Sequence, residues 1–112
     1  MEQLRPWGTY EILSSEIGYQ IKKLVVAKNQ KISLQYHQHR SEHWVVISGS
    51  GQAINGETQT SITPGCHIFV EKNTIHRLAN TGSEDLIIIE IQLGKYLEED
   101  DIVRLEDEYG RV

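Results

Sequence analysis

The stretch Leu34-Gln35-Tyr36-His37-Gln38-His39-Arg40-Ser41-Glu42-His43-Trp44 is the part of this 112-residue chain that decides the fold. It holds three of the five histidines together with a glutamate. Neutral imidazole and carboxylate are common protein ligands of first-row transition metals. Alternate residues of a β-strand share one face, so Gln35, His37 and His39 are expected to point the same way. The stretch therefore predicts β-structure that presents metal ligands.

A metal site built on this stretch needs a ligand from elsewhere in the chain. A return strand could bring Glu42 or His43 beside the first group, and His76 is the candidate for the distant ligand. Clustering by itself also fits a solvated loop in which the histidines only form hydrogen bonds. Both interpretations stay open on clustering alone.

The rest of the chain has the pattern of an all-β protein. Short segments of β-type composition recur about every eight to twelve residues, with turn residues between them. Strands are expected at residues 9–13, 19–27, 31–36, 43–48, 51–54, 57–62, 67–70, 76–79 and 86–93. Asn55-Gly56 predicts a type I′ hairpin turn, and Pro64-Gly65 predicts a type II turn. These features predict one β-barrel or sandwich domain.

Charge is distributed unevenly along the chain. Residues 1–97 hold nine acidic and nine basic side chains, whereas residues 98–112 hold seven acids and two arginines. The net charge of −5 therefore lies in the tail. We expect a barrel over residues 1–97 and an acidic tail over 98–112, packed on or extending from the same domain. A short helical turn is expected over 96–105, with the run Glu98–Asp101 as a solvated face.

Composition excludes several classes of protein. Apolar residues make up 38% of the chain and charged residues 24%, as in a globular domain. No apolar run is long enough for a membrane span or a signal peptide, so we expect a cytoplasmic protein without a membrane partner. The neutral body has no basic stripe, which argues against nucleic acid as a partner. The single Cys66 excludes an internal disulfide.

Two spaced motifs resemble those of the cupin barrels. Asn29, five residues, Gln35-x-His37, four residues, Glu42, six residues and Gly49 resemble the first motif. Gly65, five residues, Glu71-x-Asn73, two residues, His76, three residues and Asn80 resemble the second. Asn29 and Asn73 replace glycines of the family, and asparagine tolerates the left-handed conformation that glycine would supply. The resemblance implies an all-β, double-stranded β-helix (jelly-roll) barrel.

A longer resemblance covers nearly the whole chain. Its motifs are Arg5–Tyr10, Leu34–Trp44, Glu90–Gly94 and Tyr96–Arg104. They are similar to the type II mannose-6-phosphate isomerase domain, which in that family is commonly the C-terminal part of a bifunctional enzyme fused to a mannose-1-phosphate guanylyltransferase. No nucleotidyltransferase segment is present, so we expect a stand-alone domain that does not transfer guanylyl groups.

The resemblance implies a divalent metal, with zinc, manganese, cobalt, nickel and iron as candidates. Two ligand sets are open. One consists of Gln35, His37, Glu42 and His76, and the other of His37, His39, His43 and His76. The first set is preferred because the spacing from Glu42 to Gly49 belongs to it. His39 and His43 would then face the substrate or support the ligands.

The implied activity is the interconversion of mannose 6-phosphate and fructose 6-phosphate, in GDP-mannose and polysaccharide precursor metabolism. Moving a proton between adjacent sugar carbons needs a base, for which His39, His43 or a non-ligating Glu42 are candidates. The substrate phosphate needs cationic donors, and Arg40 and Arg77 are the first candidates. Arg77 follows His76 on a strand, so it should point away from the site and into solvent.

Two other functions compete with this one. A non-catalytic cupin that binds sugars or sugar phosphates would keep the barrel, and a cupin oxygenase would favour the four-histidine set with iron. The polar residues His37, Glu42 and His76 argue for activity, because polar groups in a barrel interior are costly without a use. A homodimer is expected, since small barrels leave sheet edges that can pair.

Overall fold

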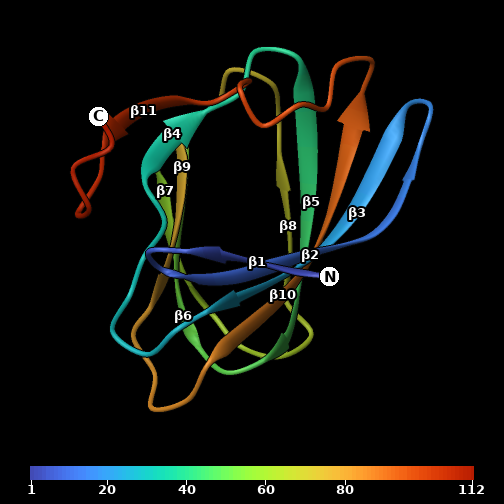
Figure 1. The fold of residues 1–112 in the computed structure, drawn as a ribbon. Helices are drawn as coiled ribbons and strands as arrows, with labels where there is room; N and C mark the ends of the chain where they lie inside the picture. The colour runs from blue at the N-terminus through green and yellow to red at the C-terminus, as the bar shows by residue number, and fades with distance from the viewer.

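The chain forms eleven β-strands and no helix in the computed structural model, which describes residues 1–112 (Figure 1). The strands are Glu2–Arg5 (β1), Gly8–Glu16 (β2), Tyr19–Val26 (β3), Leu34–Tyr36 (β4), Arg40–Ser48 (β5), Gly51–Asn55 (β6), Thr58–Ile62 (β7), His67–Val70 (β8), His76–Asn80 (β9), Leu86–Gly94 (β10) and Val103–Glu106 (β11). No helix is available that could cross a lipid bilayer. The predicted all-β class is confirmed.

The strands form two sheets that face each other. One sheet has six strands in the order β1-β2-β3-β10-β5-β8, and the other has five in the order β11-β4-β9-β6-β7. In Figure 1, β4, β9 and β7 lie opposite β3, β5 and β8. Every pairing is antiparallel, and neighbours in each sheet are often distant in sequence. The crossing order brings residues from both ends of the chain around one interior.

The interior has an apolar end and a polar end. Inward positions of β10 begin with the buried Leu86 and Ile88 and continue with the buried Glu90 and Gln92. The paired strand β5 runs the opposite way, so its polar inward residues lie beside those of β10. Strict alternation of buried and less buried residues in both strands assigns each side chain to one face. The apolar end forms the core, and the polar end is left to hold the site.

The turns bear out most of the expectations from sequence. Asn29 and Asn73 have φ angles of 64° and 63°, as expected for residues that replace glycine. Gly65 has a φ of 92°, and the amide of Cys66 donates to the carbonyl of Thr63, as in a type II turn.

The hairpin predicted at Asn55-Gly56 is present, but the prediction of a type I′ turn is wrong. Asn55 pairs with Thr58, so the loop residues are Gly56 and Glu57, and only Gly56 has a positive φ. A type I′ turn needs positive φ at both loop positions.

The prediction of a helical turn over residues 96–105 is also wrong. Val103 and Arg104 instead pair with Tyr36 and Gln35, which makes β11 the edge strand of the five-stranded sheet. The free edge of β4 offers backbone hydrogen bonds that outweigh the weak helical preference of this segment. Part of the segment after residue 97 therefore packs on the barrel as β11.

Arg77 points away from His76, as alternation predicts, but it is not solvated. Its side chain is buried and donates to the carbonyl of Ile32 (2.9 Å), to Oε1 of Glu106 (2.9 Å) and to the carbonyl of Glu106 (3.2 Å). Arg77 thus fastens the end of β11 to the barrel.

The left-handed residue Asn73 gives a direct test of the turn chemistry. Its side chain is exposed, so a substitution there changes mainly the backbone preference. Asn73→Ala should lower the free energy of unfolding by about 1 kcal/mol, because a Cβ-bearing residue without a short polar side chain is strained at positive φ. Asn73→Gly should cause no such loss. Urea denaturation followed by tryptophan fluorescence measures both, and equal losses would show that the side chain matters rather than φ.

Candidate metal and substrate site

One row of side chains across the five-stranded sheet builds the first half of the site. Gln35 on β4 is the register partner of Arg104 on β11 and of His76 on β9. Side chains directly opposite each other on neighbouring strands have Cβ atoms about 4.5–5.5 Å apart. The row therefore places an amide between an imidazole and a guanidinium on one face of the sheet.

The six-stranded sheet supplies the second half. Glu42 is an inward residue of β5, and His37 lies in the connection between β4 and β5. His37 Nε2 is 3.1 Å from Glu42 Oε2, and His76 Nε2 is 3.9 Å from Glu42 Oε1. Candidate ligand atoms of the three residues all lie within 4.8 Å of one another, and each residue is no more than 2% exposed. Gln35 Nε2 approaches His37 Nε2 at 3.5 Å, so the preferred ligand set is gathered.

The far nitrogens of the two imidazoles are fixed by backbone carbonyls. Nδ1 of His37 donates to the carbonyl of Asp101 (2.5 Å), and Nδ1 of His76 donates to the carbonyl of Thr74 (2.8 Å). Each neutral ring then presents the Nε2 lone pair to the carboxylate of Glu42, which is unfavourable unless a proton or a cation lies between them. Nε2 of His76 is buried and has no hydrogen-bond partner. The arrangement fits a bound cation, because metal-ligating histidines use their other nitrogen in this way.

The electrostatics of the cluster favour an ionised Glu42 and a neutral His76. Burial by itself would raise the pKa of Glu42, but the hydrogen bond and charge of His37, followed by the charges of His76 and Arg40, hold that pKa well below its usual range. Burial lowers the pKa of His76, only partly opposed by Glu42. An ionised carboxylate and a neutral imidazole are the ligand forms that a divalent cation requires.

Arg40 borders the cluster. Its Nε donates to Glu42 Oε2 (2.8 Å), and its Nη2 lies 3.3 Å from His37 Nε2. Nη1 is buried without a partner. Arg40 therefore supports the Glu42 carboxylate directly and keeps one unpaired donor.

His39 and His43 do not lie in the cluster. His43 lies between the inward residues Glu42 and Trp44, so alternation turns it outward. There it stacks on His67, with Nδ1 to Nε2 at 2.9 Å. His39 is exposed and meets the ring of Tyr96 edge-on. The four-histidine set is not assembled.

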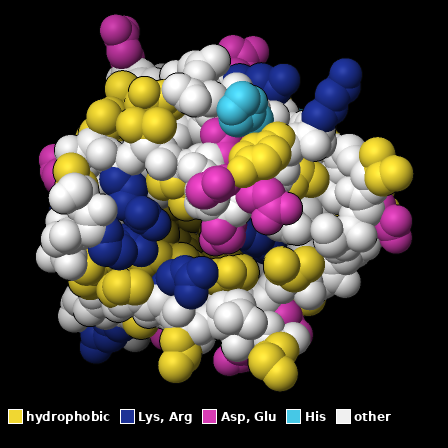
Figure 2. Space-filling model, turned by 45° about the horizontal axis from the view of Figure 1, so that its top comes forward, with side chains coloured by type: hydrophobic (Ala, Val, Ile, Leu, Met, Phe, Trp, Pro, Cys, Tyr) yellow, Lys and Arg dark blue, Asp and Glu magenta, His cyan; other side chains and the backbone are white.

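A hollow opens beside the cluster at the polar end of the barrel (Figure 2). It encloses about 510 Å³ when the part open to solvent is included. Its lining residues are Arg5, Trp7, Tyr10, Lys22, Leu24, Ile32, Gln35, Arg40, Glu90, Glu99, Ile102, Arg104 and Arg111. Five of these are cations and two are acids, so the hollow suits an anionic ligand although the whole chain carries −5.

Most of these charged residues were not found by sequence reasoning. Lys22 is an inward residue of β3, and Glu90 is an inward residue of β10. The alternation of each strand could have indicated that these charges point into the barrel. Arg104 and Arg111 lie in an acidic tail, where two basic residues give no signal by composition.

Glu90 is a buried acid in the lining of the hollow. Burial, followed by the charge and hydrogen bonding of Glu42, raises the pKa of Glu90 to about 8, against the opposing charges of Arg40 and Lys22. The indole of Trp44 and the amide of Gln92 donate to its carboxyl oxygens (3.2 and 2.8 Å). Glu90 therefore offers a carboxyl group that can hold a proton near neutral pH.

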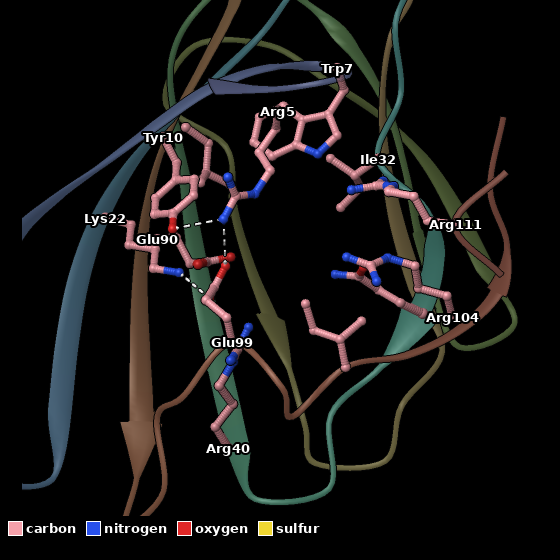
Figure 3. A pocket seen from close by; sticks show the side chains of 13 residues that line it. Arg5, Trp7, Tyr10, Lys22, Ile32, Arg40, Glu90, Glu99, Arg104 and Arg111 are labelled. Atoms are coloured by element: carbon pink, nitrogen blue, oxygen red, sulfur yellow. Dashed lines mark hydrogen bonds and ion pairs between the residues drawn. The ribbon is translucent and has the colours of Figure 1, made fainter. Parts of the chain in front are cut away.

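The acidic run Glu98–Asp101 is not a uniformly solvated face. Glu99 Oε2 lies 2.6 Å from Nζ of Lys22, across the hollow from Arg104 (Figure 3). The carboxylate of Asp101 accepts hydrogen bonds from the amides of Gln38 (2.9 Å) and His39 (3.0 Å). The run therefore forms part of the hollow and supports the loop that carries His37.

Solved structures with the same fold identify the class of this protein. A protein with a double-stranded β-helix domain from Klebsiella pneumoniae superposes with a TM-score of 0.74 at 18% identity, covering 86% of this chain and 82% of that one. KdgF from Halomonas gives 0.79 at 12% identity over 86% and 89% of the two chains. A cupin-2 domain from Rhodospirillum rubrum gives 0.71 at 18% identity over 83% and 67%. The fold is a cupin barrel.

Sequence comparison then gives the family. Residues 1–107 match the family described as mannose-6-phosphate isomerase C-terminal, and the chain belongs to this family. Alginate biosynthesis protein AlgA of Pseudomonas aeruginosa is 44% identical over 98% of this chain, and xanthan biosynthesis protein XanB of Xanthomonas campestris is 43% identical over 96%. Mannose-1-phosphate guanylyltransferase ManC of Salmonella typhimurium is 43% identical over 99%. The chain spans 23% of the length of each of these relatives.

The ion pair between Glu99 and the buried Lys22 predicts a pH-dependent contribution to stability. Burial alone would raise the pKa of Glu99, but Lys22, with Arg40 and Arg5, lowers it below its usual range. The stabilisation is then present above the ordinary glutamate pKa of about 4.3 and is lost as the pH falls through the lowered value. Glu99→Gln should lower the unfolding free energy at pH 7 by about 1 kcal/mol, because it removes a charge-assisted hydrogen bond to a buried ammonium group.

Chemical denaturation at several pH values tests this prediction. The difference between wild type and Glu99→Gln should shrink as the pH is lowered from 7 towards 3. Glu98→Gln is the matched control, since Glu98 is an exposed neighbour without an ion pair. A difference that stays constant across this range would contradict the prediction.

Proposed function

We propose that this domain is a metal-dependent aldose-ketose isomerase that interconverts mannose 6-phosphate and fructose 6-phosphate. The observation that carries the proposal is the buried, unpartnered Nε2 of His76, which faces Glu42 and His37 beside a cation-lined hollow. A hollow lined by five cations and by the candidate ligand Gln35 suits a phosphorylated sugar.

His37, Glu42 and His76 would hold the metal, with Gln35 as the fourth protein ligand. Ser33 Oγ donates to Oε1 of Gln35 (2.5 Å), and Nε2 of Gln35 faces His37. A half-turn of the amide exchanges these two atoms, so that the oxygen faces the cluster and the nitrogen donates to Ser33. A divalent cation held there supplies a Lewis acid that stabilises negative charge developing on the sugar oxygens.

The side chains of the hollow provide the remaining requirements of the reaction. Proton transfer between adjacent carbons needs a group that can hold a proton close to the sugar. The carboxyl groups of Glu90 and Glu99 line the hollow and meet this requirement, in place of the outward-facing His39 and His43. Arg40 orients the Glu42 carboxylate through its Nε.

Family membership supports the choice of substrate. The family is described as mannose-6-phosphate isomerase C-terminal. Its named relatives are biosynthesis proteins for alginate and xanthan and a mannose-1-phosphate guanylyltransferase. We therefore propose that the domain contributes to the supply of mannose phosphates for polysaccharide precursors. Guanylyl transfer is not part of the proposal, because this chain corresponds to about a quarter of those proteins.

A coupled assay for fructose 6-phosphate formed from mannose 6-phosphate tests the function. Chelator-treated protein should be inactive, and one of zinc, manganese, cobalt, nickel or iron should restore turnover. His37→Ala and His76→Ala should each lose metal binding, measured by elemental analysis after dialysis, and reduce kcat/KM by at least about a hundredfold. His67→Ala is the matched control, because His67 lies on the outer side of the barrel at the edge strand β8.

The opposite result would assign a different function. Folded, metal-loaded protein that binds mannose 6-phosphate without turnover would refute the isomerase and indicate a sugar-phosphate-binding domain. Metal binding that survives both His37→Ala and His76→Ala would refute the proposed ligand set.

A further inference from the structure

The cations of the hollow differ in how far their charges are neutralised. Lys22 has Glu99 within 2.6 Å, Arg40 has Glu42 at 2.8 Å, and Arg111 has Asp107 at 2.8 and 2.9 Å. Arg104 has no hydrogen bond or ion pair, and its Nε is buried without a partner. One guanidinium in the lining therefore lacks an anion.

Arg104 is also held beside a second guanidinium. Figure 3 shows Arg104 and Arg111 next to each other, both reaching from the C-terminal segment into the hollow, with Arg5 and Glu99 across from them. Burial, followed by the positive charge of Arg111, lowers the pKa of Arg104. The carboxylate of Asp107, which binds Arg111, opposes this lowering only in part. The free protein is thus arranged for a ligand that carries the missing negative charge.

The position of Arg104 connects this wall to the metal cluster. Arg104 is the register partner of Gln35, which in turn is the register partner of His76. An anionic group bound by Arg104 is therefore one strand away from the candidate ligand Gln35. Gln35 itself lines the hollow, so a ligand bound by Arg104 lies beside this residue.

We propose that Arg104 and Arg111 bind the phosphate group of a phosphomonoester, with Arg5 as a further donor from across the hollow. This assignment locates the phosphate-binding part of the site proposed above and rests on that function for the identity of the sugar. The planar fork of Arg104 suits the oxygens of a phosphate dianion. Arg111, whose Nε and Nη2 are bound by Asp107, can add a contact through its remaining nitrogen, Nη1. Phosphate would then supply the anion that Arg104 lacks.

The two arginines favoured by sequence reasoning are less suited to this role. Arg77 is bound to Glu106 and to the carbonyl of Ile32, and it does not line the hollow. Arg40 does line it, but two of its nitrogens are directed to Glu42 and His37. Arg40 therefore serves the metal cluster first, and Arg104, which has no anionic partner, is left for the phosphate.

Calorimetric titration of the chelator-treated full chain separates this site from catalysis. The probes are inorganic phosphate, mannose 6-phosphate and mannose. Arg104→Gln should weaken binding of mannose 6-phosphate and of phosphate at least about tenfold, because it removes hydrogen bonds to a charged group. Arg104→Lys should recover part of the affinity, since it restores the charge without the fork. Binding of unphosphorylated mannose should be unchanged in both variants.

Two controls exclude trivial losses. The melting temperature of Arg104→Gln should not fall, because Arg104 makes no hydrogen bond or ion pair that the substitution could break. Lys23→Gln removes one positive charge from β3 at the outward position between the buried Lys22 and Leu24, and should leave phosphate binding intact. Equal losses in Lys23→Gln and Arg104→Gln would mean that the effect is one of net charge, which overturns the site.

The remaining outcomes distinguish the site from the proposed function. Unchanged affinity for mannose 6-phosphate in Arg104→Gln, with turnover and KM also unchanged, overturns the phosphate site and leaves the isomerase standing. Absence of turnover with every metal, together with phosphate binding that depends on Arg104, overturns the isomerase and supports the site. Arg111→Gln should weaken phosphate binding in the same direction, and a variant pair without any loss overturns the assignment of both arginines.

Discussion

The carboxylate of Glu42 is 1% exposed, in an interior where an isolated charge would cost several kcal/mol. The surrounding side chains are arranged to offset that cost. Arg40 and Trp44 donate to its two oxygens, and the imidazoles of His37 and His76 present nitrogen atoms to the same group. Removing any one of these partners would leave buried polar atoms unsatisfied. The polar end of the barrel is organised around this one ionised group.

The C-terminal segment completes this arrangement from outside the barrel motifs. The carbonyl of Asp101 accepts a hydrogen bond from the ring of His37 and so fixes its orientation. The carboxylate of Asp101 accepts hydrogen bonds from the backbone amides of Gln38 and His39. Arg77 anchors β11 through Glu106, and β11 in turn presents Arg104 opposite Gln35. A segment that composition describes as an acidic tail therefore positions both a candidate ligand and a wall of the hollow. In this segment Asp101 accepts hydrogen bonds from backbone amides, and Glu99 and Glu106 form ion pairs with Lys22 and Arg77.

The sequence predicts the elements that depend on neighbouring residues. Alternation and turn residues were sufficient for nine of the strands, and motif spacing selected Gln35, His37, Glu42 and His76, which lie close together in the structure. The positive φ at Asn29 and Asn73 also followed from local chemistry. The short β1 and β11 were missed because each is defined by the free edge that it pairs with.

The outward position of His43 has a specific cause. Parity along a strand places His43 outward once Glu42 is inward, so the two could not both face the metal. The break between β4 and β5 at residues 37–39 resets that parity, and counting from Gln35 through this break is therefore unreliable.

The hollow was missed for a different reason: its lining comes from β1, β2, β3, β4, β5, β10, β11 and the segments that connect or follow them. The positive charge of the hollow arises only when folding brings its five cations together. The net charge of −5 gives no sign of this cluster. An acidic surface gives little long-range attraction to an anion, so recognition in this domain has to rest on short-range guanidinium contacts inside the hollow.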